Sequence, residues 1–380
     1  MAWWIRPLVR LLAALSLPIL VPAIITLVVW MLPGTLASTI CPPGCAREAR
    51  ETTVQEYHLQ SPWSDDIRAS VGLAPLTVVE DNPEAQEEGE PAYVPEDDYT
   101  TGQSVVATAS ATLDAGYFLV NWLRRAVVLD FGRGKVGTYT AFEISDLIWS
   151  ALPNTMLLIG TALTLVMGGM VLAATGVLPK RVDNILQGVG VIPAVFMALF
   201  VYAILQIFMG GDPFAFDVDL GTSEPLAIQP LAILFGGLAL GLADGAASGA
   251  VIGTRNLFES EVKQRYIGIA VLRGESVLGN ALPNLLPALV GQLRGRVLHL
   301  VSGTVIVELV LQINGLGDLL WNSTLDKATF VILAAAWGFS LISALLLLIQ
   351  ALSEVGVAIL VRRAPHVPVA VPATAAVEGA

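Results

Sequence analysis

Few residues in this chain combine the types and the spacing that catalysis requires. Residues 130–132 spell the DFG triplet with which protein kinases hold a metal ion, but no other kinase element accompanies them. The stretch 132–138 (GRGKVGT) has the glycines and lysine of a phosphate-binding loop without its GxxxxGK[ST] spacing. The three histidines are scattered, at His58, His299 and His366. We see no nucleophile–base set and no metal-ligand cluster, so we predict a protein that is not an enzyme and needs no cofactor.

The two cysteines, Cys41 and Cys45, lie in the run CPPGC. No second cysteine pair or histidine cluster accompanies them, which argues against a zinc site. If this segment lies outside the cytoplasm, the pair fits a small disulfide loop. Two free thiols fit the sequence equally well.

Most of the net charge of −12 comes from one segment. Residues 80–98 hold nine acidic side chains and no basic one. The segment is rich in Pro and Glu and poor in apolar residues, so we predict a disordered acidic loop. Such a run of charges is usually just exposed to solvent, and binding of a partner is the alternative. The acidic balance also argues against a nucleic-acid partner.

Apolar residues dominate the rest of the chain, because 55% of all residues are hydrophobic, 14% are charged and the mean hydropathy is +0.71. This apolar fraction exceeds what the core of a soluble protein needs, whereas helices that span a bilayer require it. The first run is longer than the apolar segment of a signal peptide, so we predict that it is retained. We predict an all-α polytopic membrane protein with six transmembrane helices, at 11–32, 147–179, 185–211, 226–254, 282–312 and 329–361.

The distribution of Lys and Arg predicts the orientation of these helices. Basic residues gather in the segments 1–10, 180–184, 255–280 and 362–380, which a single orientation places together in the cytoplasm. The loop 212–224 carries only acidic charges and falls on the opposite side, as does the long polar segment 33–146. Both termini are therefore expected inside, with an extracytoplasmic segment between the first two helices.

Several ionisable residues lie within the predicted spans, where each is costly and needs a reason. Asp244 falls in the fourth span, and His299 and Glu308 fall in the fifth. They are candidates for lining a water-filled translocation path. The alternative is that they pair with each other or with a partner subunit. Arg294 and Arg296 lie near enough to a helix end to reach the interface with their long side chains.

The segment 255–287 resembles the cytoplasmic "EAA" loop of ABC-importer permeases. A basic stretch there runs into NALPNLLP (280–287) and then into a long span. Further segments are similar, in family order, to the B-type permease of the dipeptide, oligopeptide and nickel branch. These are WWIRPLVRLL…VVWMLPG (3–34), NWL…LDFG (121–132), SALPNTMLL (150–158), Ile192-Pro193, TVIVE (304–308) and NGLGDLL (314–320).

This resemblance implies a membrane subunit that divides into a first helix (1–32), the segment 33–146, a five-helix core (147–361) and a tail (362–380). It implies a heterodimer with a second permease, two cytoplasmic ATPase subunits and an extracytoplasmic solute-binding protein, in the inner (plasma) membrane of a bacterium or archaeon. The solute would be peptide-like or another small polar molecule. Within the loop 255–280 and just beyond it, the implied ATPase-coupling residues are Arg255, Lys263, Arg265, Tyr266, Ala270, Arg273, Gly274, Asn284 and Pro287.

The chain departs from the family pattern at three places, one of them the acidic insertion at 80–98, which identifies it as a divergent member. The glycine of the loop aligns either with Ala270 or, if residues are missing before Asn280, within the segment 266–274. Ser353-Glu354-Val355 replaces the usual acidic-Pro-Arg ending of the last span. Two other functions stay open. One is an ion-coupled secondary transporter with Asp244, Glu308 and His299 as a relay, and the other is a non-transporting scaffold or degenerate paralogue.

Overall fold

The computed structural model of the chain describes residues 5–31, 55, 58–73, 100–136, 139–209, 230–326 and 328–363. The predicted disulfide pair Cys41 and Cys45, the acidic loop 80–98 and the tail from 364 lie outside these residues. The described elements are α1 (Ile5–Met31), α4 (Ser64–Ala69), α5 (Thr101–Val127), β1 (Arg133–Val136), β2 (Tyr139–Glu143), α6 (Ile144–Ala174), α7 (Arg181–Gly190), α8 (Ala194–Met209), α9 (Pro230–Leu242), the 3₁₀ turn η3 (Ala243–Gly245), α10 (Ala246–Val262), α11 (Arg265–Leu272), α12 (Val277–Val310), α13 (Leu316–Leu325) and α14 (Thr329–Arg363).

The described chain is helical, as predicted, apart from one short hairpin. Strands β1 and β2 pair antiparallel, with Arg133 opposite Glu143 and an irregularity between Gly134 and Val136. The hairpin joins α5 to α6, because β2 runs directly into α6 at Ile144.

Four helical segments in the described part are long and apolar enough to cross a membrane: Leu11–Val29, Ile144–Ala174, Pro230–Val262 and Thr329–Val357. A fifth span results if the pair α7 and α8, bent by 101°, counts as one. Helix α12 has 34 residues, but charged and polar side chains interrupt its apolar run. A polytopic helical membrane protein is thus confirmed, while the count of six spans stays a prediction.

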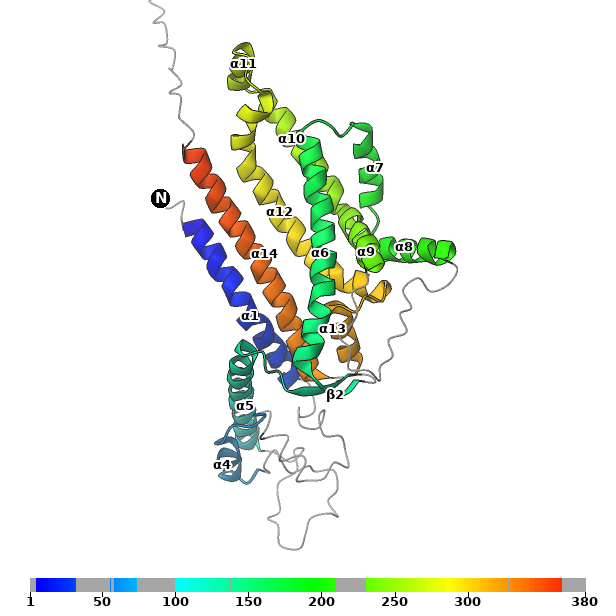
Figure 1. The fold of residues 1–380 in the computed structure, drawn as a ribbon. Helices are drawn as coiled ribbons and strands as arrows, with labels where there is room; N and C mark the ends of the chain where they lie inside the picture. Colours follow the sequence, from blue (N-terminus) through cyan, green and yellow to red (C-terminus); the bar gives the residue numbers. More distant parts are fainter. Residues whose placement is uncertain are drawn as a thin grey trace, which may run out of the picture.

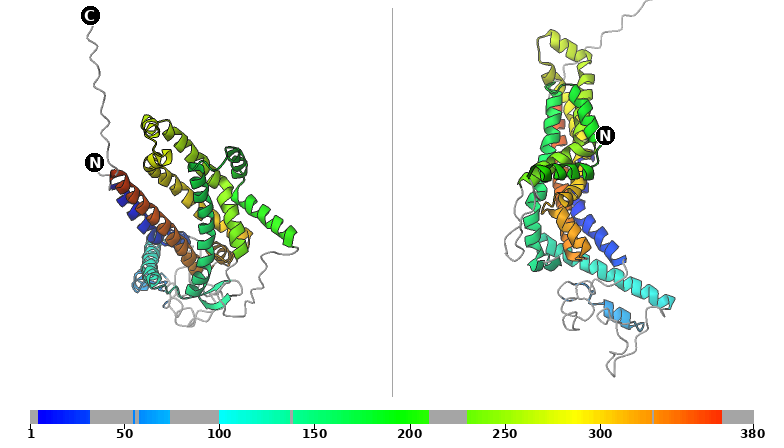
Figure 2. Two further views of the ribbon diagram at one scale, coloured as in Figure 1. Left: turned by 45° about the horizontal axis from the view of Figure 1, so that its top comes forward. Right: turned by 90° about the vertical axis from the view of Figure 1, so that its right-hand side faces the viewer.

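The helices are arranged with distinct ends (Figure 1). Helix α11, the start of α1 and the end of α14 lie at one end of the molecule, and α5, the hairpin and α13 lie at the other. Figure 2 shows α8 leaving the bundle sideways and α5 extending away below it. The predicted orientation, in which both termini and the loop around α11 lie in the cytoplasm, stays a prediction.

Two apolar clusters hold the bundle together. The first joins α5, α6, α13 and α14 and contains the aromatic pairs Phe118–Phe330 and Phe131–Trp337. The second joins α6 to α8, α9, α10 and α12 around Leu158, Leu240, Leu300, Leu311 and Ile313. Outside these clusters many large apolar side chains of α1, α6 and α14 stay exposed, which suits a surface that faces lipid.

Helices α6 and α9 approach each other without spare room. A Cβ atom on Gly237 would stand 1.9 Å from Oγ1 of Thr161, and one on Gly241 would stand 3.3 Å from the carbonyl oxygen of Ala162. Small residues allow such close approach of membrane helices, where tight packing replaces the hydrophobic driving force. We call this contact between α6 and α9 the glycine seam.

The described part of segment 33–146 contains the helices α4 and α5. Helix α5 begins with a capping box, in which Thr100 and Gln103 satisfy each other's backbone N–H groups. Its buried Asp114 accepts hydrogen bonds from the backbone N–H of Ser61 (2.7 Å) and the hydroxyl of Ser64 (2.8 Å). One carboxylate thereby fastens α4 to α5.

Candidate functional site

The residues predicted to couple the protein to an ATPase gather around α11. This eight-residue helix stands between α10 and α12 at the tip of the molecule (Figure 1). Ile267 and Ala270 are buried on its inner face, while Leu272 is 89% exposed and Ile269 and Val271 are also exposed. An amphipathic helix that presents apolar side chains at a tip is suited to dock into a groove of another protein.

A polar brace holds α11 against its neighbours. Asn284 of α12 donates hydrogen bonds to the hydroxyl of Tyr266 (2.8 Å) and to Glu261 of α10 (3.2 Å), and the Tyr266 hydroxyl bonds Glu261. Burial of the phenol and its hydrogen bond to Glu261 raise the pKa of Tyr266 above its usual 10.0. The phenol therefore keeps its proton and can donate, so that three successive helices are linked through one hydroxyl.

The other predicted loop residues surround this brace. Lys263 caps the end of α10, Arg265 begins α11 and Arg273 follows its last turn. Gly274 adopts the left-handed φ of 75° that ends α11 and turns the chain toward α12. Together with the exposed apolar residues, the three cations form the outer surface of this loop.

The remaining predicted positions lie deeper or further along. Ala270 is buried, whereas nothing lies within 4 Å of a Cβ placed on Gly268. Pro287 lies inside α12, so it does not mark the end of that helix. The two registers of the loop glycine stay open, since both place α11 at the same point.

Arg255 lies apart from this surface, and its role as a coupling residue stays a prediction. It lies on α10, its side chain is 9% exposed, and it forms an ion pair with Asp183 of α7. It also donates a hydrogen bond to the carbonyl oxygen of Leu178 (2.7 Å). The sequence did not indicate this ion pair, because the acidic partner of Arg255 is 72 residues away.

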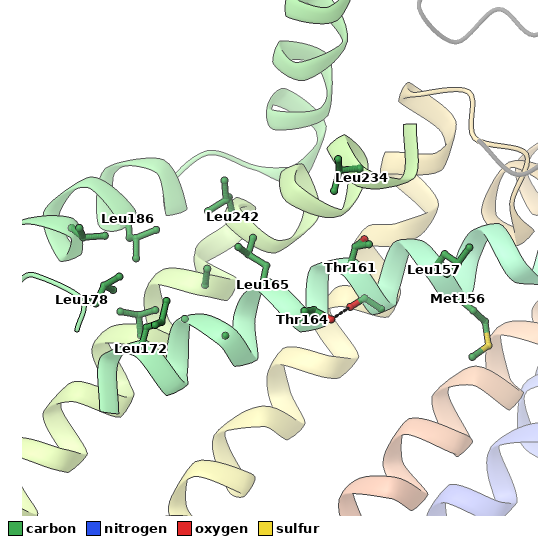
Figure 3. Close-up of a pocket in the computed structure, with 16 residues that line it drawn as sticks. Met156, Leu157, Thr161, Thr164, Leu165, Leu172, Leu178, Leu186, Leu234 and Leu242 are labelled. Atoms are coloured by element: carbon green, nitrogen blue, oxygen red, sulfur yellow. Dashed lines mark hydrogen bonds between the residues drawn. The ribbon is translucent and has the colours of Figure 1, made fainter. Parts of the chain in front are cut away.

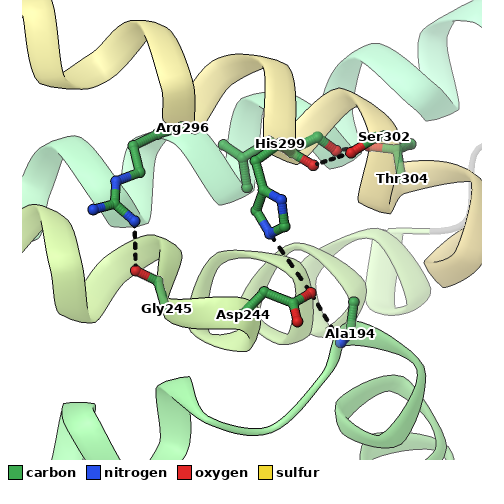
Figure 4. A network of polar contacts seen from close by, with 8 residues as sticks. Ala194, Asp244, Gly245, Arg296, His299, Ser302 and Thr304 are labelled. Atoms are coloured by element: carbon green, nitrogen blue, oxygen red, sulfur yellow. Dashed lines mark hydrogen bonds and ion pairs between the residues drawn. The ribbon is translucent and has the colours of Figure 1, made fainter.

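Two of the three candidates for the translocation path come together between α12 and the turn η3 (Figure 4). Nε2 of His299 lies 3.5 Å from Oδ2 of Asp244, and the two side chains are 40% and 31% exposed. Arg296, one turn before His299 on α12, donates a hydrogen bond to the carbonyl oxygen of Gly245 (2.7 Å). The pair thus stands at a surface of the subunit, in a polar patch within apolar helices.

The third candidate, Glu308, lies elsewhere and is fully buried. Its Oε2 accepts a hydrogen bond from the backbone N–H of Gly317 (2.6 Å) at the start of α13. A Cβ on Gly315 would stand 2.3 Å from its carboxyl carbon, so glycine is needed for this approach. In the described structure this carboxylate binds the turn between α12 and α13, and its role in a translocation path stays a prediction.

An open apolar groove runs along α6 (Figure 3). Its volume is about 760 Å³, and α7, α9 and α10 contribute its other walls. Gly160, Thr164 and Gly168 follow one face of α6 at every fourth position, and a Cβ on either glycine would meet nothing within 4 Å. The groove holds no charged side chain, so it offers packing surface and no site for chemistry.

The described residues contain no group of three or more His, Cys, Asp or Glu side chains that could hold a metal ion. The contacts that sequence reasoning missed are those between distant segments. Asn154 donates to the carbonyl oxygen of Asn314 (2.9 Å), and Thr155 accepts from the N–H of Leu316 (2.7 Å). Both lie in SALPNTMLL, where the polar residues in an apolar run were the available signal.

The fold and these sites define a helical membrane protein with an exposed amphipathic helix at one end and a partly exposed polar patch among its helices. Residues 166–364, just over half of the chain, match the family described as "Binding-protein-dependent transport system inner membrane component". The chain belongs to this family. It is therefore an integral membrane protein and the permease component of a transport system, not an enzyme. No curated protein matches the sequence.

Proposed function

We propose that the chain is one of two membrane-spanning subunits of an ATP-driven importer for a peptide-like or other small polar solute. Its partners are a second permease, two cytoplasmic ATPase subunits and an extracytoplasmic solute-binding protein, in the inner membrane of a bacterium or archaeon. The observation that carries the proposal is α11. This helix is braced to α10 and α12 at one side and presents exposed apolar and basic residues at the other.

The coupling loop supplies a mechanism. Closure of the ATPases would move α11, and the hydrogen bonds around Tyr266 would pass that movement to α10 and α12. Helix α10 begins directly after Gly245, the neighbour of Asp244, and α12 carries His299, so the movement reaches the polar patch around these residues. The peptide-like solute and the heterodimer are taken from the B-type resemblance of residues 3–34, 121–132 and 304–320.

The test is a pull-down of the tagged full chain in mild detergent, with ATP hydrolysis assayed on the recovered complex. We expect an ATPase subunit and a second permease to co-purify. Charge reversal by Arg265→Glu or Arg273→Glu should lower ATPase recovery at least fivefold, because both cations lie on the docking surface. Arg124→Glu is the matched control, since Arg124 is exposed on α5 at the other end of the molecule. A chain recovered alone or as a homodimer would contradict the proposal.

An ion-coupled secondary transporter is the second candidate, and the contact between Asp244 and His299 favours it. A carboxylate beside an imidazole within a membrane core can relay protons. Glu308 does not extend this relay, because it faces α13. Uptake in proteoliposomes driven by a proton gradient without ATP would support this candidate, and ATP-dependent uptake would exclude it. Neither kind of uptake, with the protein still folded, would point to a scaffold or a degenerate paralogue.

A further inference from the structure

Two helix breaks lie side by side in the membrane core. Helices α7 and α8 meet at 101° across residues 191–193, and α9 is separated from α10 by η3. At the second break Asp244 and Gly245 adopt left-handed φ angles of 51° and 73°. A break frees backbone N–H and C=O groups, and within a bilayer no water is present to satisfy them.

Asp244 satisfies the groups that the first break frees. Its backbone N–H donates to the carbonyl oxygen of Ile192 (3.0 Å), and its Oδ2 accepts from the N–H of Ala194 (3.1 Å). One residue therefore pairs with both sides of the bend at Pro193. The left-handed backbone of Asp244 is uncommon for a residue other than glycine and persists because these contacts fix it.

The crossing is too close for ordinary side chains. A Cβ on Gly190, the last residue of α7, would stand 2.5 Å from Oγ of Ser248 and 3.1 Å from Cα of Gly245. The end of α7 therefore rests directly on the start of α10. The two breaks form one joint, made of Gly190, the bend 191–194 and the turn 243–245.

Helix α12 reaches this joint with two side chains one turn apart. Arg296 bonds the carbonyl oxygen of Gly245, and His299 contacts the carboxylate of Asp244 (Figure 4). Arg296 lies 19 residues after the start of α12 at Val277, which is about 28 Å of helix. Both helices that flank α11, α10 and α12, thus run from the coupling loop to the joint.

Stability alone does not account for three ionisable groups at this point. Apolar residues would pack in a membrane core at lower cost than charged ones, and polar groups at membrane depth usually serve function. Asp244 and His299 are also partly exposed, so their contact can open without unpacking the core.

We propose that Asp244 and His299 are positioning residues for transport. They pin the joint, so that movement of α11 changes the angle between α10 and α12 and, through Asp244, the direction of α8. This inference rests on the proposed importer function and names the point at which the coupling movement is converted. Neither residue needs to touch the solute for this role.

The test follows the movement of α8 by spin labels in the full complex. Labels are attached at Phe200→Cys on α8 and Val171→Cys on α6, both exposed, with Cys41 and Cys45 replaced by serine. ATP with vanadate, added to the co-purified complex, should shift the distance between the labels by several ångströms. This probe needs no knowledge of the solute.

Asp244→Asn and His299→Gln should each reduce that shift by half or more, and the double variant should reduce it no further. Asparagine tolerates the left-handed φ and keeps an acceptor for Ala194, so the joint still folds while its contact with the imidazole is weakened. Thr304→Val is the matched control, because this buried hydroxyl bonds only the carbonyl oxygen of Leu300 in its own helix.

The outcomes distinguish a failure of the proposed joint from a failure of the proposed importer function. An undiminished shift in both single variants would overturn the joint as a conversion point, as would a complex that binds the ATPase but shows no shift without substitutions. Additive losses, accompanied by lowered melting temperatures, would assign the pair a structural role instead. Failure of any ATPase to co-purify would overturn the importer function and the role of the joint with it.

Discussion

Glu308 illustrates how a carboxylate in an apolar helix can serve the architecture of the protein. It is fully buried, and its Oε2 binds the first free N–H groups of α13 at Gly317. A negative charge or acceptor at a helix N-terminus is favourable because unpaired N–H groups point toward it. The residue therefore holds α12 and α13 at a fixed angle, and Gly315 leaves room for it.

We expect Glu308→Ala to destabilise the protein by about 1–3 kcal/mol, because it leaves a buried N–H group without a partner. Glu308→Gln keeps an acceptor for Gly317 and should cost much less. The melting temperature in detergent, followed by tryptophan fluorescence, checks both variants against Thr304→Val. Equal losses for the alanine and glutamine variants would show that the capping bond is not what matters.

Asp318 gives the protein a pH-dependent stability. Burial raises its pKa from the usual 3.8 to about 6, although a hydrogen bond from Asn322 (3.1 Å) opposes the shift. The folded state therefore binds this proton more tightly than the unfolded state. The contribution is complete below pH about 4 and is lost as the pH rises through about 6.

We predict that Asp318→Asn flattens the decline of the melting temperature between pH about 4 and pH about 6. Asparagine is neutral throughout this range and can still bond Asn322. The control is Asp66→Asn on α4, which is exposed and should leave the profile unchanged. A profile for Asp318→Asn that overlays the parent protein would contradict this explanation.

At the scale of elements, one side chain of α5 makes two of the contacts that hold α4 in place. Asp114 of α5 is 1% exposed and accepts from both Ser61 and Ser64. Helix α4 has only six residues, which is too short to be stable by itself in water. Its position therefore depends on contacts with α5, and the carboxylate of Asp114 makes two of them.

We expect Asp114→Ala to release α4 while the membrane helices stay folded. Limited proteolysis should then cut within 58–73 at least tenfold faster than in the parent protein, since local opening exposes the backbone. Asp66→Asn again provides the control on the same helix. Cleavage spread over the whole chain would mean that Asp114 supports more than α4.

The long apolar helices could be predicted from the sequence, whereas the break at Asp244 could not. Uninterrupted runs gave α1, α6 and α14 within a few residues, because hydropathy reports directly on burial in lipid. Pro193 indicates the bend after Gly190, since proline removes a helix hydrogen bond. The break at Asp244 depends on contacts between segments 50 residues apart. Asp244 and His299 were found as costly residues, and their contact matches the alternative that such residues pair with each other.

In the candidate site, too, the positions of residues could be predicted from the sequence, whereas the contacts of Arg255 and Glu308 could not. The loop residues around Tyr266 were located by resemblance, and α11 lies among them. Arg255 was predicted for the loop and Glu308 for the path on the basis of their charge. The sequence did not indicate which residues they contact. Asp183 and the N-terminus of α13 become partners only once the bundle is folded.

For the whole molecule, the orientation in the membrane can be tested directly. Leu272 on α11 and Val127 at the end of α5 are 89% and 81% exposed, at opposite ends of the bundle. With Cys41 and Cys45 replaced by serine, a membrane-impermeant maleimide should label Val127→Cys in intact spheroplasts. Leu272→Cys should react only after lysis. Labelling of both residues from the same side would contradict the predicted orientation.

The glycine seam has a consequence for how this protein can diversify. An added methyl group at Gly237 would collide with Thr161, so α6 and α9 behave as one solid block and can neither drift apart nor accept bulk between them. Gly160 and Gly168 line the groove beside this seam, where a Cβ would meet nothing within 4 Å, so these positions tolerate larger residues. A saturation library along α6 and α9 should therefore divide by position, with forbidden substitutions at the glycines of the seam and free variation at the open glycines of the groove. Adaptation to a new solute or a new partner has only the open positions available to it.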